Sequence, residues 1–259
     1  MKGGQVTLSR RLQMLADMVT PGNRVADVGC DHGFLSVFLV QRRISPHVLA
    51  MDVRKGPLAA AAGHVEECGL GAYIETRLSD GLENLAAKEA DTLVCAGMGG
   101  RLMQRILAEG MEKAEGLKEL ILQPQSELGA FRRFLRREGF RIVGEDAVCE
   151  EGKYYFAMKA VPGGGNPEAE GYPACAEKAG QERMEERQLF DEYGELLLRQ
   201  RHPVLHQYLL FQEKILIRLR EGLETGNTKR TAGRLEEISR EQAQIRQALK
   251  WFEENGSAV

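Results

Sequence analysis

The chain has 259 residues, of which 43% are hydrophobic and 28% are charged, and its formal net charge is −3 at pH 7. This composition is that of a folded globular protein and excludes a disordered or collagen-like chain. A charge so close to zero also excludes a uniformly basic surface, so any contact with nucleic acid would depend on local arginine clusters.

Neither the N-terminus nor the cysteines suggest an exported or metal-binding protein. The sequence contains no run of about 18 apolar residues, so we expect no membrane-spanning helix. The opening residues MKGGQVTLSRRLQML lack the apolar core of a signal peptide, and we expect a cytoplasmic protein. No C-x-x-C pair occurs among the five cysteines, so we expect no zinc site, no other metal site and no disulfide framework.

Strand-like and helix-like patterns alternate along the chain up to about residue 160. In order, they predict a helix over 8–19, a strand over 24–29, a helix over 33–43, a strand over 47–53, a helix over 56–69, strands over 73–81 and 90–100, a helix over 101–111, a strand over 119–125 and a helix over 128–140. Residues 141–161 predict two strands joined in a hairpin at residues 150–152. The alternation is typical of an α/β fold with a mostly parallel sheet, helices on both faces and an antiparallel edge.

A second region follows a segment rich in proline and glycine. We predict a first domain over 1–160, a linker over 161–180 and a helical domain over 181–255. Two heptad stripes in the helical domain predict an antiparallel coiled-coil hairpin; they are Leu205, Leu209, Gln212, Leu216, Leu219 and Leu223, then Thr231, Leu235, Ile238, Gln242, Ile245, Leu249 and Phe252. The two glutamines either face each other or lie separately on the surface. The hairpin is compatible with a monomer or a weak dimer.

The turn after the first predicted strand reads ADVGCDHGF and carries unusual chemistry for a nucleotide-binding turn. Gly29 and Gly33 are in place, but Asp31 stands where a dinucleotide fingerprint has its middle glycine. A carboxylate there would repel a pyrophosphate. S-adenosyl-L-methionine is more compatible, because its ammonium and sulfonium groups can meet Asp27 and Asp31 while backbone N–H groups bind its carboxylate.

Further polar residues follow the next predicted strands, at what would be the same sheet edge. Asp52 suits the ribose hydroxyls of a nucleoside, Asp80 suits an adenine amino group, and the glycines after the fourth strand leave the backbone open. The expected cofactor-binding set is Asp27, Gly29, Cys30, Asp31, His32, Asp52, Val53, Ser79, Asp80, Gly81, Ala96, Gly97 and Met98. Each acid taken alone is also interpretable as a helix cap or turn residue.

The segments LSRRL, ADVGCDHGFL, RLSDGLE, CAGMGG, LILQPQ and EEGKYY resemble the bacterial TrmK family, the tRNA (adenine(22)-N1)-methyltransferases. The likeness runs from about Leu8 to Lys159 and continues weakly into RQRHPVLHQYLLFQEKI. It implies a class I, Rossmann-like methyltransferase domain with a C-terminal coiled-coil hairpin. It also implies S-adenosyl-L-methionine as cofactor, S-adenosyl-L-homocysteine as product, and tRNA as substrate. One departure is Gln125, because the family carries asparagine after the Gln-Pro pair.

In the implied reaction, adenine N1 attacks the methyl group of the cofactor, so the protein must mainly position the base. Asp31 is the candidate catalytic group, expected to be buried beside the methyl group, where it would stabilise the cationic product. Its alternative roles are cofactor positioning and helix capping. Arg11 is a second candidate, holding a tRNA phosphate, with an ion pair to Asp17 or Asp31 as the alternative. The expected substrate-binding residues are Arg10, Arg11, Gly99, Gly100, Gln123 and Pro124.

Two other functions remain open from the sequence. One is a methyltransferase of this fold that acts on another RNA base or on a small molecule. The other is a non-catalytic RNA-binding protein with a degenerate cofactor turn. Candidate RNA-binding clusters are Arg10–Arg11, Arg42–Arg43 and the group Arg132, Arg133, Arg136 and Arg137, each of which is alternatively a solvated helix face.

Overall fold

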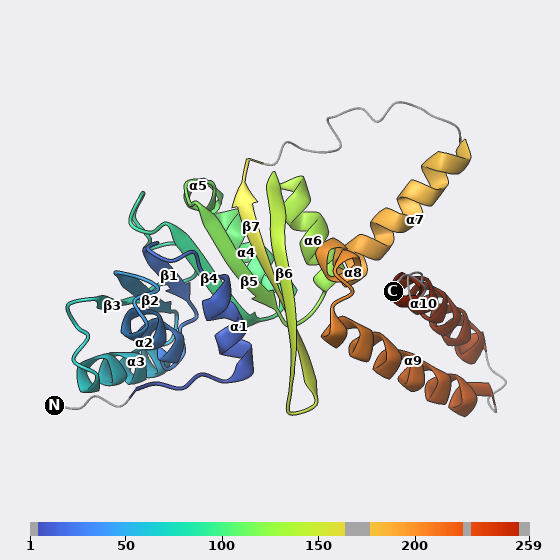
Figure 1. Ribbon diagram of the computed structural model, residues 1–259, viewed down its shortest axis with the longest axis horizontal. Coiled ribbons are helices and arrows are strands. Elements are labelled where there is room, and N and C mark those ends of the chain that lie inside the picture. Colours follow the sequence, from blue (N-terminus) through green and yellow to red (C-terminus); the bar gives the residue numbers. More distant parts are fainter. Residues whose placement is uncertain (1–4, 164–176, 225–228, 254–259) are drawn as a thin grey trace, which may run out of the picture. The chain divides into compact units, whose positions relative to one another are not determined.

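The computed structural model describes residues 5–163, 177–224 and 229–253 and separates the chain into two compact units, Met1–Pro173 and Ala174–Val259 (Figure 1). The division falls inside the predicted linker 161–180. Most of that linker lies outside the described residues, so its boundaries stay a prediction. In the described part of the chain, no helix is both long and apolar enough to cross a membrane.

A seven-stranded sheet forms the centre of the first unit. Its strands are β1 (Val25–Val28), β2 (Val48–Asp52), β3 (Ile74–Leu78), β4 (Thr92–Met98), β5 (Glu119–Pro124), β6 (Phe140–Glu150) and β7 (Lys153–Pro162). They lie in the order β3-β2-β1-β4-β5-β7-β6. The first five strands of this order are parallel, whereas β7 runs antiparallel to both β5 and β6. The predicted parallel sheet with an antiparallel hairpin at its edge is confirmed.

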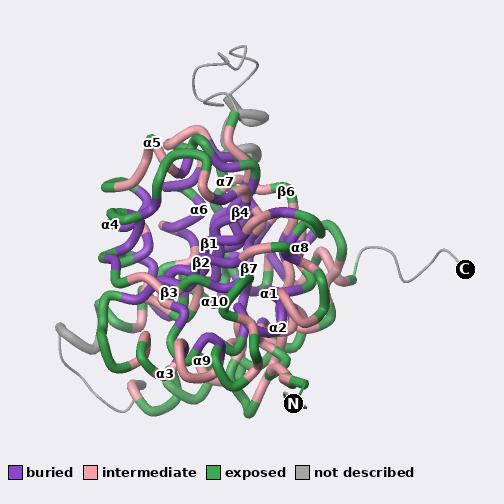
Figure 2. Tube along the Cα trace, turned by 90° about the vertical axis from the view of Figure 1, so that its left-hand side faces the viewer, coloured by how far each residue is buried: buried purple, intermediate pink, exposed green. Residues whose placement is uncertain are grey.

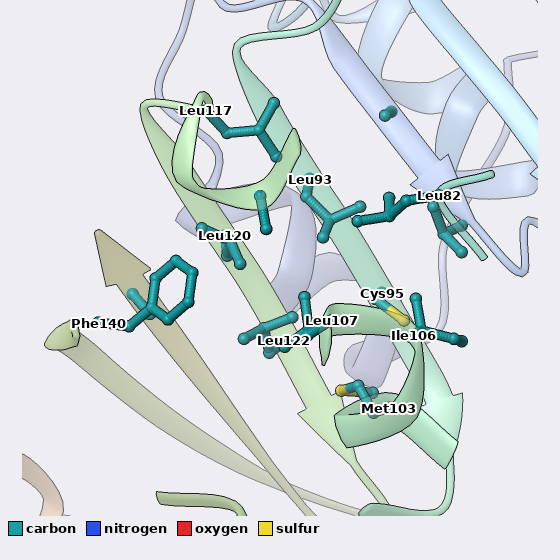
Figure 3. Close-up of a cluster of buried hydrophobic side chains, with 14 of the residues drawn as sticks. Leu82, Leu93, Cys95, Met103, Ile106, Leu107, Leu117, Leu120, Leu122 and Phe140 are labelled. Carbon is teal, nitrogen blue, oxygen red and sulfur yellow. The ribbon is translucent and has the colours of Figure 1, made fainter. Parts of the chain in front are cut away.

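Helices cover both faces of this sheet because the buried strands alternate their side chains between two apolar layers. These helices are α1 (Arg10–Met18), α2 (Phe34–Gln41), α3 (Lys55–Glu67), α4 (Gly100–Glu109), α5 (Met111–Glu115) and α6 (Leu128–Arg137). In β5, Leu120 and Leu122 pack with α4 and α6, whereas Ile121 belongs to the layer under α1, α2 and α3. Figure 3 shows the first layer, and Figure 2 shows buried residues running along β1, β2 and β4.

The prediction that the arginine cluster at residues 132–137 binds RNA is wrong for Arg132. The Arg132 side chain is only 3% exposed, and its Nε lies 2.8 Å from Oε1 of Glu145, which is also buried. Removing one partner of such a buried pair is strongly destabilising, because the other charge is left uncompensated. Arg132 therefore ties α6 to β6 and is not available to a phosphate, although Arg133 and Arg137 are exposed.

The second unit is helical, with α7 (Glu177–Tyr193), α8 (Glu195–Arg199), α9 (Pro203–Glu224) and α10 (Lys229–Glu253). α9 and α10 pack together, and their buried residues include heptad positions Leu205, Leu209, Leu216, Ile238 and Ile245. The predicted helical hairpin is confirmed, but the stripe is wrong at Leu219, which is 45% exposed. Gln242 is buried and accepts a hydrogen bond from Arg220 Nη1 at 3.5 Å, so the alternative that both glutamines lie on the surface is wrong.

Candidate active site

The turn after β1 is tied directly to the neighbouring strand β2. The backbone N–H groups of Gly29 and Cys30 both donate to the carbonyl oxygen of Met51, at 2.8 and 3.0 Å. Gly29 adopts a φ of +77°, and a side chain there would start 2.2 Å from Cε of Met98. The glycine is therefore required for the backbone conformation, and the flexible Met98 side chain fills the space beside it. Burial raises the pKa of the Cys30 thiol, which keeps that thiol protonated.

Asp31 occupies the same turn but is not buried, so that expectation was wrong. Its carboxylate is 63% exposed and lies 3.9 Å from Nη2 of Arg54 and 3.8 Å from Nε2 of His32. The helix-capping alternative is also wrong, because Gly33 is the N-cap of α2 and no side chain caps that helix. Asp31 has a φ of +50°, an uncommon conformation for a residue other than glycine, and its carboxylate lies on the solvent side of the turn.

Two buried acids lie at the ends of the adjacent strands β1 and β2. Asp27 accepts a hydrogen bond from Oγ of Ser36 at 2.6 Å, and Oδ1 of Asp52 accepts one from the backbone N–H of Arg54 at 2.8 Å. The pKa of Asp27 is raised to about 6, mainly by burial and also by the nearby charge of Asp52, against the opposing effect of the Ser36 hydrogen bond. A cationic ligand group at this edge would relieve the repulsion between the two carboxylates. Val53, directly after Asp52, is exposed beside them.

The loop after β3 has both a structural part and an exposed part. The buried hydroxyl of Ser79 donates to the carbonyl oxygen of Gly81 at 3.0 Å and accepts from the backbone N–H of Asn84 at 3.1 Å. Those bonds hold the loop closed. Asp80 points outward and pairs with Arg105 on α4 at 3.2 Å. The structure therefore gives Ser79 a loop-forming role and leaves the Asp80 carboxylate exposed to solvent.

The end of β4 carries a bulge at Gly97, between Ala96 and Met98 in the pairing with β5. Sδ of Met98 lies 3.8 Å from Sγ of Cys95, so its side chain turns back over the sheet toward β1. The Gly100 backbone N–H donates to Oγ of Ser126 at 3.2 Å, and a side chain at Gly100 would clash with the Ser126 carbonyl oxygen. Gly100 thus serves close packing at the start of α4. Gly99 is the N-cap of that helix.

Arg11 reaches from α1 to the end of β5. Its Nη1 donates to Oε1 of Gln123 at 3.0 Å, and its guanidinium lies 5.7 Å from the ring centroid of Tyr155 on β7. The predicted alternative ion pairs are wrong: Asp17 accepts instead from Gln13. Gln123 is fully buried, next to the last β5 residue, Pro124. At the same helix, the backbone N–H of Arg10 donates to Glu150.

Sequence reasoning missed Ser36, Arg54 and Tyr155. Arg54 could have been found from the sequence, because it is a basic residue only two positions after Asp52, the acid proposed to bind ribose. Tyr155 lies in the family-like segment EEGKYY, but its contact with Arg11 was not predictable because it depends on the pairing of β7 with the central sheet.

The residues at this edge suit the sulfonium cofactor expected from the sequence. Two buried carboxylates meet at the β1–β2 ends, where a cation is favourable and a pyrophosphate is not. Farther along the edge, a buried amide nitrogen of Gln123 has no hydrogen-bond partner in the described chain. This orphaned donor lies at the ends of β4 and β5, where open α/β sheets bind their ligands.

Comparisons with known proteins agree with this geometry. Residues 8–158 match the family described as "Methyltransferase domain". The tRNA (adenine(22)-N(1))-methyltransferase of Bacillus subtilis is 36% identical over 159 residues, which are 61% of this chain and 67% of the relative.

Solved structures give the same relationship over nearly the whole chain. The B. subtilis m1A22 tRNA methyltransferase TrmK superposes with a TM-score of 0.77 at 27% identity, covering 94% of this chain and 99% of that one. A Streptococcus pneumoniae structure in complex with S-adenosyl-L-methionine gives a TM-score of 0.74 at 29% identity, covering 94% and 100%. The fold, the acid-lined glycine turn and these relatives agree that the chain belongs to the TrmK family of class I methyltransferases.

Proposed function

We propose that this protein transfers the methyl group of S-adenosyl-L-methionine to N1 of adenine 22 in tRNA. The observation that carries the proposal is the match of residues 8–158, which contain the whole acid-and-glycine edge, to a methyltransferase domain whose relatives carry this activity. An enzyme that methylates tRNA works where tRNA is held, so we also propose a cytoplasmic location.

The cofactor supplies an electrophilic methyl group on a positively charged sulfur. We assign Asp27 and Asp31 to its cationic end, Asp52 to the ribose hydroxyls and Asp80 to the adenine amino group. The backbone N–H groups at the start of α2 are available to its carboxylate, because the first N–H groups of a helix lack intrahelical acceptors. Of the two acids assigned to the cationic end, Asp27 is buried, where a low dielectric strengthens the attraction, whereas Asp31 is exposed.

The acceptor is the lone pair of adenine N1. As the N1–CH₃ bond forms, the S–CH₃ bond breaks and its electron pair stays on sulfur, so the positive charge moves from the cofactor to the base. The product becomes neutral when a proton leaves N6. We propose that the exposed carboxylate of Asp31 either accepts this proton or stabilises the positive charge on the base before the proton leaves. Its contacts with Arg54 and His32 are both longer than 3.7 Å.

The tRNA side of the site lies along α1 and the ends of β4 and β5. Arg10 and Arg11 are suited to phosphate or base contacts, with Gly99, Gln123 and Pro124 forming the adjoining wall. We further propose that the helical unit, residues 181–255, contributes contacts to the tRNA and none to the cofactor.

The test is nucleoside analysis by mass spectrometry of a tRNA transcript incubated with the protein and methyl-labelled S-adenosyl-L-methionine. We expect 1-methyladenosine to form, and we expect none in a matched transcript in which adenine 22 is replaced by guanine. Label in a different nucleoside would favour a methyltransferase of another specificity. Tight tRNA binding with no label in any nucleoside would favour the non-catalytic RNA-binding function.

A further inference from the structure

The side-chain amide of Gln123 is fully buried at the end of β5, opposite Ala96 of β4. Its oxygen accepts the hydrogen bond from Nη1 of Arg11 at 3.0 Å. Its nitrogen, Nε2, has no hydrogen-bond partner among the residues that the structure describes. Buried polar groups in folded proteins are almost always paired, so an unpaired amide N–H at a candidate site points to an acceptor supplied by a ligand.

The direction of this amide is determined by its neighbours. A guanidinium has only donors, so the atom that faces Arg11 must be the oxygen of Gln123, and the amino group must lie on the other side of the amide. Arg11 is held in turn over the aromatic ring of Tyr155. Helix α1 and strands β5 and β7 together therefore present one N–H donor in a defined orientation.

The backbone at the β4 bulge lies close beside this arrangement, and residue 97 has no side chain. A Cβ built on Gly97 would lie 3.5 Å from Nη1 of Arg11 and 3.9 Å from Nε2 of Gln125. The φ of Gly97 is +76°, a conformation that side chains other than glycine rarely adopt. Two nitrogen groups thus border the backbone at the bulge, and a ligand rich in acceptor atoms suits them.

We propose that Nε2 of Gln123 donates a hydrogen bond to a ring nitrogen of the target adenine, with Arg11 and Tyr155 acting as positioning residues for that donor. This inference rests on the proposed function. Adenine has three ring nitrogens that accept hydrogen bonds in tRNA: N1, N3 and N7. N1 must keep its lone pair for the methyl group, and the amino group at N6 is a donor, so the partner of Gln123 is N3 or N7.

The experiment changes the base and the protein together. Transcripts carry adenine, 7-deazaadenine or 3-deazaadenine at position 22, and wild type is compared with Gln123→Glu at saturating cofactor in single-turnover reactions. The glutamate keeps an oxygen toward Arg11 and removes the N–H donor. Both base analogues also change the basicity of N1, and this intrinsic effect cancels when the analogue-to-adenine rate ratio is compared between the two proteins.

We expect wild type to discriminate against one of the two analogues by about tenfold more than Gln123→Glu does, since that analogue lacks the acceptor. Tyr155→Leu should reduce the discrimination in the same direction, and Tyr155→Phe should preserve it because the ring remains. Equal ratios in wild type and Gln123→Glu for both analogues would overturn the inference. If Gln123→Glu does not fold, as judged by thermal unfolding, Gln123→Met carries the same comparison.

The two proposals fail in different ways. Wild-type protein that methylates adenine 22 but shows the same analogue ratios as its variants refutes only the role of Gln123. Wild-type protein that transfers no methyl group to the unmodified transcript refutes the proposed function, and the inference with it.

Discussion

Replacing Asp27 by asparagine should make the protein more stable while weakening its cofactor site. Asp27 is buried at the end of β1, and its carboxylate accepts a hydrogen bond from Oγ of Ser36 at 2.6 Å. Burial raises the pKa of this carboxyl from its usual 3.8 to about 6. Asparagine has nearly the same shape, keeps an oxygen for Ser36 and carries no charge at any pH.

The sign of the effect follows from proton binding. Between pH 3.8 and about 6 the folded protein retains the Asp27 proton that the unfolded chain loses, so the free energy of unfolding falls as pH rises through this window. At 1.36 kcal/mol per pKa unit, the full cost above pH 6 is about 3 kcal/mol. The cost is about 1 kcal/mol at pH 4.5, where only part of the difference in proton binding has accumulated.

Urea unfolding of wild type and Asp27→Asn between pH 4.5 and 8, at constant ionic strength, measures this difference. We expect the variant to gain about 1 kcal/mol at pH 4.5 and about 3 kcal/mol at pH 7.5, with a plateau above pH 7. Asp17→Asn, at an exposed acid on α1, is the matched control and should show no comparable rise. A difference that does not grow with pH, or a variant less stable than wild type at pH 7.5, would refute the reasoning.

The same substitution should have the opposite effect on function. If Asp27 faces a cationic group of the cofactor, Asp27→Asn should bind S-adenosyl-L-methionine about tenfold more weakly by calorimetry at pH 7.5, because a charge-assisted contact becomes a neutral one. Strained or charged active-site groups commonly lower stability in this way. Unchanged affinity would remove Asp27 from direct contact with the ligand.

Three other changes separate cofactor binding, chemistry and tRNA binding. Asp52→Ala should weaken S-adenosyl-L-methionine by about 1–3 kcal/mol in calorimetry through lost hydrogen bonds to ribose, and unchanged affinity would exclude that contact. Asp31→Asn should lower the single-turnover rate by about 100-fold with little change in tRNA affinity, and a normal rate would leave Asp31 only as a cofactor contact. Arg11→Ala should instead weaken tRNA binding, as measured by filter binding. A chain ending at Gly163 should bind the cofactor normally and lose tRNA methylation, and full methylation would refute the proposed role of the helical unit.

The order of helices and strands in the first unit was predictable from the sequence because each element has a clear local pattern. Apolar runs such as Val48–Asp52 are long enough for a buried strand, and glycine turns mark their ends. The parallel arrangement then places Asp27 and Asp52 at one edge without any side-chain information. Local pattern was therefore sufficient for the fold and for placing the candidate acids at one edge of the sheet.

The contacts within the site were not predictable in the same way. Arg11 and Gln123 are 112 residues apart, and their hydrogen bond depends on how α1 crosses the sheet. The exposure of Asp31 depends on a left-handed backbone conformation that a residue other than glycine rarely adopts. In the helical unit, the heptad spacing identified the helices but did not predict that Leu219 is exposed. A heptad row of apolar residues on one helix does not show which of its positions the partner helix covers.

The bridge from Arg11 to Gln123 has a consequence for the order in which the protein becomes functional as it folds. The acids and glycines proposed to contact the cofactor lie between residues 27 and 98, in the segment that runs from β1 to the end of β4. The donor at Gln123 needs the first helix, the fifth strand and Tyr155 of the last strand, which are contacts of high sequence separation and hence slow to form. In a chain still emerging from the ribosome, every residue proposed to contact the cofactor would therefore be synthesised well before Tyr155, which lies over Arg11.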